Sequence, residues 1–353
     1  MKKHWPWLLF AVFALEVAFS LKPRTDKPDD FQIREWAKLP ALINGRVQPF
    51  DSIARNSLLV IRGNTTVPLE GNGANGAWGR WETLQAPLSE RKWHQFSQHP
   101  KKLSPGEWLL EVFSKAGLAD TRYIFLIHHP ELIGELKLQD KGVENSGLRY
   151  YSFNDIKPNL AVMERESKKV GEIKQELRTP YQRSLMGLHN GLQTYLRLKN
   201  SLKPERSADF SAELVQFEKM IPAGFRAIRA QQAGQAHDKE VFEKFLKYAE
   251  PYSMMAQMAY PLLVPPTQPG QKKTDWANVG QALMDGIRTG EVPAAVHAHA
   301  ALATAYAQGK PAEFNRALDE YRASLVGKLD GELRKGRQEH LFNQFLPFYR
   351  SMM

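Results

Sequence analysis

Two arginines and an aspartate stand close together near the start of the sequence. Arg46, Asp51 and Arg55 all lie in the segment 39–55. A guanidinium group carries parallel N–H donors that match the two oxygens of a carboxylate. The segment therefore predicts one of two arrangements: a structural corner with two buried arginines, or a contact with an acidic ligand.

A pair of histidines is the second candidate site. His128 and His129 follow a short apolar run and precede Pro130. Adjacent side chains of an extended chain point to opposite faces, so one of the two could face a pocket. Imidazole is a common ligand of metals and of haem iron. The pair is thus the candidate haem-binding site, and the alternative is a loop start at which a histidine caps the next helix.

The other polar residues do not form a catalytic set. The sequence has no cysteine, which excludes disulfides, thiolate catalysis and covalent c-type haem attachment. It lacks H-E-x-x-H, G-x-S-x-G and the P-loop. His297 and His299 are two residues apart, which is a poor chelating spacing on a helix. Glu332 and Glu339 resemble solvated helix faces, and we expect a non-enzymatic protein.

Composition supports a globular body with a basic surface. The 353 residues are 42% hydrophobic, enough for a core, and the net charge is +10. The basic residues are dispersed among acidic ones, and no nucleic-acid-binding motif is present, so nucleic acid is not an expected partner.

The N-terminus predicts export. A basic start, residues 1–4, is followed by an apolar run at 5–21 that is interrupted only by Pro6, Glu16 and Ser20. The run is a membrane anchor or a cleaved signal peptide. Trp5 and Trp7 suit a membrane interface and favour the anchor. Either way the bulk of the chain would lie outside the cytoplasm.

A turn and a helix must position the arginines. Asn44 and Gly45 both tolerate positive φ, and apolar residues flank them, which indicates a tight hairpin. Pro49 keeps the preceding residue extended. Asp51 is then expected to cap a helix that ends at Gly63.

The rest of the chain predicts a mainly helical fold with a small β element. Residues 104–107 carry a capping box that opens a helix ending at Gly117. The histidine pair follows a predicted strand at 123–127, which would pair with 148–153 across a helix at 130–138. From residue 154 onward the apolar spacing is helical. Further helices are expected at 276–287, 294–307 and 311–325.

Three regions follow from these elements. Residues 1–30 are an anchor or signal with a linker. Residues 31–263 are a mixed, then helical, extracytoplasmic domain. The proline-rich break at 264–270 opens a helical C-terminal subdomain, 264–353, whose aromatic end would suit a membrane surface.

The segment 39–55 resembles a block near the start of the CcsA/ResB-type fusion proteins of cytochrome c assembly. Similar motifs recur over most of the chain after residue 31. The block is matched by Leu39, Pro40, Gly45, Arg46, Pro49, Phe50, Asp51, Ser52, Ala54 and Arg55; the later motifs are 104–110, 125–132, 148–153, Trp276, Ala305-Tyr306, Phe314-Asn315, and Phe342-Asn343 with Pro347-Phe348-Tyr349-Arg350.

The resemblance implies a subunit of the haem-delivery machinery at the bacterial inner membrane, with one N-terminal span and its bulk in the periplasm. A CcsA-like polytopic membrane protein and apocytochrome c would be its partners. Haem would be transient and held mainly by the membrane partner. The fusion proteins continue into a polytopic domain with a tryptophan-rich haem motif, whereas this sequence stops at Met353. That difference implies a split gene or a fragment.

Residues 77–82 resemble the tryptophan-rich motif only faintly and are expected to form a surface loop. The alternative function is a periplasmic binding or sensing module unrelated to haem.

Overall fold

The computed structural model describes residues 25–69, 101–145, 147–267, 270–272 and 274–345, together with Trp7 and Phe10. Several predictions concern residues outside these ranges: most of the apolar run at 5–21, the loop at 77–82, and the end at 346–353. Within the described residues, no helix combines the length and the apolar character that crossing a bilayer requires.

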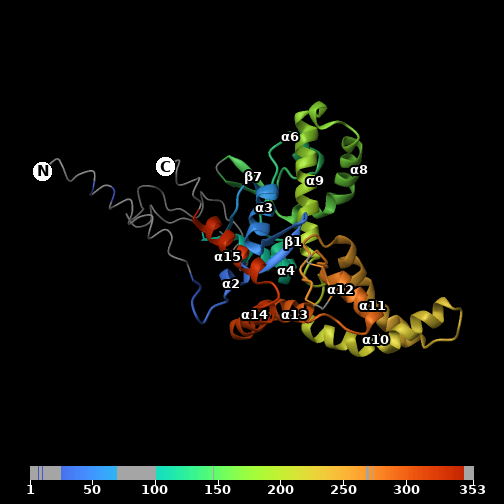
Figure 1. The fold of residues 1–353 in the computed structure, drawn as a ribbon. Helices are drawn as coiled ribbons and strands as arrows, with labels where there is room; N and C mark the ends of the chain where they lie inside the picture. The colour runs from blue at the N-terminus through green and yellow to red at the C-terminus, as the bar shows by residue number, and fades with distance from the viewer. Residues whose placement is uncertain are drawn as a thin grey trace.

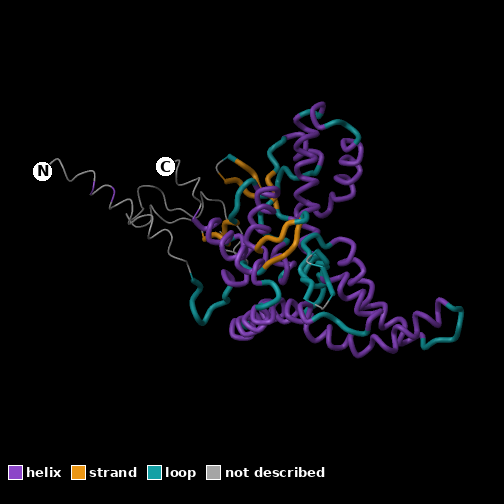
Figure 2. The backbone as a smooth tube through the Cα atoms, in the orientation of Figure 1, coloured by secondary structure: helices purple, strands orange, loops and turns teal. Residues whose placement is uncertain are grey.

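The fold is mainly helical with small antiparallel sheets, as predicted (Figures 1 and 2). The helices are α2 (Ile33–Trp36), α3 (Phe50–Arg62), α4 (Pro105–Ser114), α5 (Ala116–Ala119), α6 (Pro130–Glu135), α7 (Phe153–Ile156), α8 (Leu160–Gly171), α9 (Pro180–Lys199), α10 (Phe210–Gln232), α11 (Lys239–Met258), α12 (Val279–Thr289), α13 (Ala294–Ala307), α14 (Pro311–Leu325) and α15 (Asp330–Phe345). The strands are β1 (Pro40–Ile43), β2 (Arg46–Pro49), β3 (Val67–Leu69), β4 (Lys101–Leu103), β5 (Phe125–Leu126), β6 (Val143–Asn145) and β7 (Leu148–Tyr151).

The predicted hairpin is present between β1 and β2. Ile43 pairs with Arg46, so Asn44 and Gly45 form a two-residue loop. Both loop residues have positive φ, 51° and 74°. This geometry matches the twist of the flanking strands, which is why an Asn-Gly pair forms the loop.

Helix α3 does not begin as expected, and the prediction that Asp51 caps it is wrong. The helix starts at Phe50, its N-cap is Pro49, and no side chain caps it. The backbone N–H of Phe50 donates to the Leu39 carbonyl, and that of Asp51 donates to the Ala37 carbonyl. Since neighbouring backbone satisfies these donors, the Asp51 carboxylate is available for other contacts. The end is as predicted, because Gly63 adopts φ 70° at the C-cap.

The capping box of α4 is confirmed. The Ser104 side chain accepts from the Glu107 N–H, and the Glu107 carboxylate accepts from the Ser104 N–H. The predicted end at Gly117 is wrong, because α4 stops at Ser114. The chain breaks at Lys115, where φ is −127°, and Gly117 lies inside the short helix α5.

The predicted pairing of the two later strands is also confirmed. β5 pairs with β7, and α6 lies between them in the chain. The strands are shorter than expected. β6, which was not predicted, completes a sheet in the order β5-β7-β6.

One hydrophobic core runs through most of the described chain. It includes residues on both sides of the predicted boundary at 264. Leu42 of β1 bridges to Leu262, and Val264 bridges to Ala277. The division at 264 remains a prediction.

Near the C-terminal end of the described chain, α15 lies against β2 and α3 (Figure 1).

Candidate functional site

The first candidate site is a cavity of about 340 Å³, here called the terminal cleft. Residues from both ends of the described range 25–345 line it, from Asp26 to Gln344. Helices α2, α3, α4 and α15 contribute most of the lining. Its lining comprises Asp26, Ile33, Arg34, Ala37, Asp51, Arg55, Thr65, Thr66, Ser104, Pro105, Gly106, Glu107, His340, Asn343 and Gln344.

Asp51 is the centre of the polar network in the terminal cleft. Its side chain is 4% exposed, and Arg55 Nε donates to Oδ2 over 2.9 Å. Asn343 Nδ2 donates to the same oxygen over 3.0 Å. His340 Nδ1 lies 3.5 Å away, at ion-pair distance. The aspartate thus joins the start of α3 to α15.

These neighbours decide the ionisation of Asp51. Burial by itself raises the pKa of this carboxyl, but the adjacent His340 imidazole and Arg55 guanidinium outweigh burial and lower the pKa below its usual value. The carboxylate is therefore charged at neutral pH and holds its partners by charge-assisted contacts.

Arg46 and Glu339 make a second connection between the same elements. Arg46 Nη2 contacts Glu339 Oε2 over 2.7 Å, and Ser52 Oγ donates to Glu339 Oε1 over 2.6 Å. Glu339 is only 22% exposed, so the prediction of a solvated helix face is wrong for it. The side chain of Arg46 is 67% exposed and that of Arg55 18%. The prediction of two buried arginines is therefore wrong for Arg46, because the hairpin turn carries it to the surface.

The motif glycine and proline shape this connection. Gly45 provides the turn that precedes Arg46, and Pro49 faces α15 at Gly336, where an added Cβ would lie 3.8 Å from the proline Cβ. These contacts support the structural alternative for the segment 39–55. Contact of Arg46 or Arg55 with an acidic ligand remains a prediction.

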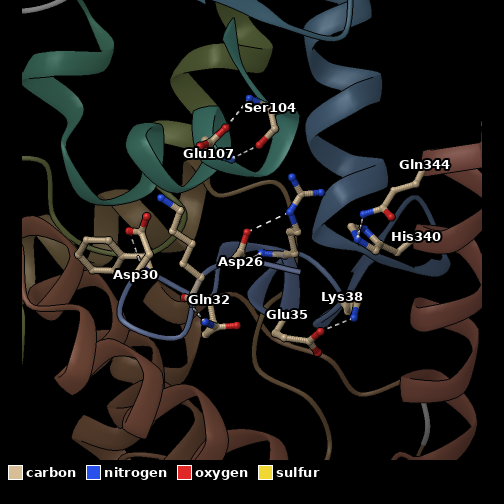
Figure 3. Close-up of polar contacts among 12 residues, drawn as sticks. Asp26, Asp30, Gln32, Glu35, Lys38, Ser104, Glu107, His340 and Gln344 are labelled. Atoms are coloured by element: carbon tan, nitrogen blue, oxygen red, sulfur yellow. Dashed lines mark hydrogen bonds and ion pairs between the residues drawn. The ribbon is translucent and has the colours of Figure 1, made fainter. Parts of the chain in front are cut away.

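The other acidic residues of the terminal cleft also have partners. Arg34 donates from its backbone N–H and from Nε to Asp26, over 2.7 and 3.0 Å. Figure 3 shows Asp26 in the middle of the view, the Ser104–Glu107 capping pair above it, and His340 with Gln344 to the right. The charges in this cleft are thus largely balanced by one another.

The second candidate site is a cavity of about 490 Å³, here called the α9 groove. It lies between the last turn of α3, strand β5 and the first half of α9, which runs beside α3 (Figure 1). Most of its lining is apolar, and its charged or titratable side chains are basic. The lining comprises Leu59, Val60, Ile61, Arg62, Gly63, Phe125, Leu126, His128, Pro180, Arg183, Ser184, Gly187, Leu188 and Gly191.

The predicted histidine pair divides between two environments. His128 is exposed and lines the α9 groove. His129 turns away, and its ring meets the Tyr181 ring edge-on with the centroids 5.6 Å apart. His129 is the N-cap residue of α6, but its side chain makes no capping hydrogen bond. The structure therefore does not bring both imidazoles to one ligand, and only His128 is positioned to face a bound molecule.

The two histidines of α13 have structural partners. His299 is fully buried, and its Nε2 lies 3.1 Å from the Leu263 carbonyl oxygen and 3.5 Å from the Tyr321 hydroxyl. Burial lowers the pKa of His299 to about 4, so the imidazole is neutral at pH 7. His297 contacts Glu218 of α10 over 2.9 Å. Both help to pack α13 against its neighbours.

A metal centre is not evident in the described ranges, where no group of three or more His, Asp or Glu residues could hold an ion. Two buried charge pairs have structural roles. Arg122 makes two hydrogen bonds to Glu111, and Lys199 contacts Asp120. These pairs join α4, the turn after α5 and α9.

Sequence reasoning missed several residues of both sites. His340 and Asp26 carried no motif, and Glu339 was assigned to the solvent. The one available signal was Phe342-Asn343, which resembles a family motif and whose asparagine contacts Asp51 and Ser52. Arg62 and Arg183 of the α9 groove gave no signal, because single arginines on helices are usually solvated.

Comparison with known proteins adds no assignment. No protein-family model matches this chain, and no curated protein matches it.

Proposed function

We propose that this chain is a non-enzymatic subunit of the haem-delivery and cytochrome c ligation machinery. It would be tethered to the bacterial inner membrane by the apolar run at 5–21, with its bulk in the periplasm. Its role would be to scaffold a CcsA-like polytopic membrane partner that passes haem to apocytochrome c. The proposal rests on the resemblance of the sequence to the CcsA/ResB-type fusions and on one structural observation.

That observation is the direct contact between the first and last motifs of the resemblance. Asn343, from the Phe342-Asn343 motif, donates to Asp51 Oδ2 over 3.0 Å and to Ser52 Oγ over 2.9 Å. These partners belong to the opening block at 39–55, nearly three hundred residues earlier. Two segments that resemble one family therefore form one interlocked unit, which supports reading them as a shared feature.

The position of this unit suits a scaffold. Asp26 and Gln344 line the same cleft, so the chain enters and leaves the described body at one side. The apolar run at 5–21 precedes this side in the sequence. A body attached there would present the rest of its surface to the periplasm and to soluble partners.

Any role in holding haem would fall to His128 rather than to the histidine pair. His128 borders an apolar groove with basic side chains, which fits a molecule with an apolar face and carboxylates. Haem bound there would supply an iron able to accept an imidazole nitrogen. The chain itself would contribute the apolar wall and the positive rim.

Deletion of the gene tests the proposal. We expect loss of covalent haem staining in c-type cytochromes and its return with a wild-type copy. Normal staining in the deletion strain would rule out this function. Immunoblotting of the apocytochrome separates a ligation defect from a failure of cytochrome synthesis.

A periplasmic binding or sensing module unrelated to haem is the second candidate. The α9 groove favours it, because its volume lies in the range of small-molecule sites. A deletion strain with normal cytochromes, combined with a purified chain that binds a small ligand, would support this candidate.

A further inference from the structure

We propose that the α9 groove is a binding site for an amphipathic organic acid, a small molecule with an apolar body and a carboxylate. The inference does not depend on a role in cytochrome assembly. It rests on the shape of the groove, on the sign of its charges and on two glycines that keep it open.

The walls of the groove are apolar and accessible. Leu59 and Val60, in the last turns of α3, are 49% and 55% exposed and both line the groove. Leu188 and Phe125 lie on the inner side and belong to the core. An apolar body placed in the groove would cover side chains of both kinds.

Glycines on α9 leave room for that body. Gly187 has no atom within 4 Å of the position that a Cβ would occupy. At Gly191 the nearest atom to such a Cβ is Ile61 Cα, at 3.5 Å, so α9 and α3 approach closely there. Glycine is a poor helix former, and two of them on one face of α9 lower helix stability without filling the groove.

The charges of the groove have one sign. Among the described residues that line it, none is acidic, whereas Arg62, His128 and Arg183 are basic or titratable. Arg62 is held in place by its hydrogen bond to the Tyr123 carbonyl and by the Tyr150 ring, 4.2 Å beneath its guanidinium carbon. Burial lowers the pKa of Arg62 to about 10, so it stays charged at neutral pH.

Arg183 is the residue best placed to meet a carboxylate at the rim. It is exposed, and its Nη1 donates a hydrogen bond to the Arg178 carbonyl, which fixes one side of the guanidinium. A guanidinium can donate two parallel hydrogen bonds to a carboxylate. His128 stands on the β5 side of the same groove and adds a second polar contact.

Binding of porphyrins to the full-length chain tests the site. The purified chain is titrated with protoporphyrin IX and with its dimethyl ester, and binding is followed by porphyrin fluorescence. The two probes share an apolar ring and differ in the free carboxylates. We expect the diacid to bind at least tenfold more tightly than the diester.

A blocking variant shows where the probe binds. Gly187→Leu would fill the groove and raise helix propensity, so we expect a folded protein with at least tenfold weaker binding. Gly171→Leu on α8 is the matched control, because its Cβ position is also open and lies outside the groove. Arg183→Gln should weaken diacid binding several-fold and leave the diester unchanged.

Competition identifies the source of the acid. Displacement of protoporphyrin by oleate would assign the site to acids with an extended chain, and failure of oleate to compete would assign it to tetrapyrrole acids. A haemin spectrum that changes in His128→Ala would place the iron beside that imidazole.

The inference is overturned if no probe binds, if Gly187→Leu binds as the wild type does, or if the diester binds as tightly as the diacid. None of these results depends on cytochrome staining, so the two proposals fail separately.

Discussion

The two ends of helix α3 handle charge in opposite ways. Its first turns face the terminal cleft, where Asp51 is surrounded by Arg55, His340 and Asn343. Its last turns face the α9 groove, where most of the lining is apolar, the charged or titratable side chains are basic, and the described wall carries no acidic side chain. Balanced charges of the first kind hold elements together. An excess of positive charge, as in the wall of the groove, attracts an anionic ligand.

Of the variants considered, removal of the Asp51 carboxylate should reduce the free energy of unfolding the most. Asp51→Ala leaves Arg55 and His340 together without their buried anion, and we expect a loss of about 3 kcal/mol in the free energy of unfolding. Urea denaturation measures it. Asp285→Ala is the control, because its contact with Arg288 is exposed and should contribute less than about 1 kcal/mol.

The same carboxylate predicts an acid dependence. The folded-state pKa of Asp51 is lowered, so its contribution to stability is present above the unfolded-state pKa of about 3.9 and is lost as pH falls below it. Asp51→Asn should remove this part of the acid sensitivity. A change of less than about 1 kcal/mol for Asp51→Ala at neutral pH would contradict a structural role for the cleft.

Burial of His299 should make the free energy of unfolding depend on pH. His299 has a folded-state pKa of about 4, below the unfolded value of about 6.5, so the unfolded chain gains a proton first as pH falls. The contribution of His299 to the free energy of unfolding should therefore be fully present above pH 6.5. It should decrease by ~3 kcal/mol as the pH falls to 4.

Unfolding free energies measured across this range check the histidine prediction. His299→Gln should flatten the slope of the unfolding free energy against pH. An unchanged slope in His299→Gln would assign the dependence to other groups.

A methyl group at Gly336 should disturb the terminal cleft. An added Cβ would lie 2.6 Å from the Lys38 carbonyl oxygen, which is backbone and cannot move aside easily. We expect Gly336→Ala to cost about 1–3 kcal/mol and to raise amide exchange along α15. Gly331→Ala in the same helix has open space around its Cβ and should show neither effect.

A methyl group at Gly187 should have the smallest effect, and of the opposite sign. Its Cβ position is open, so Gly187→Ala gains helix propensity without a clash, and we expect stabilisation by about 0.5–1 kcal/mol. Denaturant unfolding measures the gain. Destabilisation would show that α9 packs more tightly against α3 than an open groove allows.

Local features of the fold were predictable because each depends on a few adjacent residues. The Asn44-Gly45 turn, the Ser104–Glu107 capping box and the stop at Gly63 are all present. The helices at 294–307 and 311–325 also lie where their spacing placed them. The failures were contacts between distant segments. Asp51 was expected to cap its own helix, but backbone from Leu39 and Ala37 satisfies that helix start instead.

The candidate sites show the same division. The sequence indicated that Arg46, Asp51 and Arg55 act together, since one short segment carries them all. It did not indicate that Glu339 and His340 complete the cluster. It also suggested that one of two adjacent histidines could face a pocket, without showing which.

The sequence by itself determined the helical class, the turn that presents Arg46, the C-terminal end of α3, the start of α4, and the absence of thiol chemistry. Those properties follow from backbone preferences and side-chain chemistry that act over a few residues. Only the tertiary structure decided that α15 returns to Asp51 and that α9 lies beside the end of α3. Such contacts depend on how apolar faces far apart in the chain bury one another, and a single sequence does not specify which faces meet.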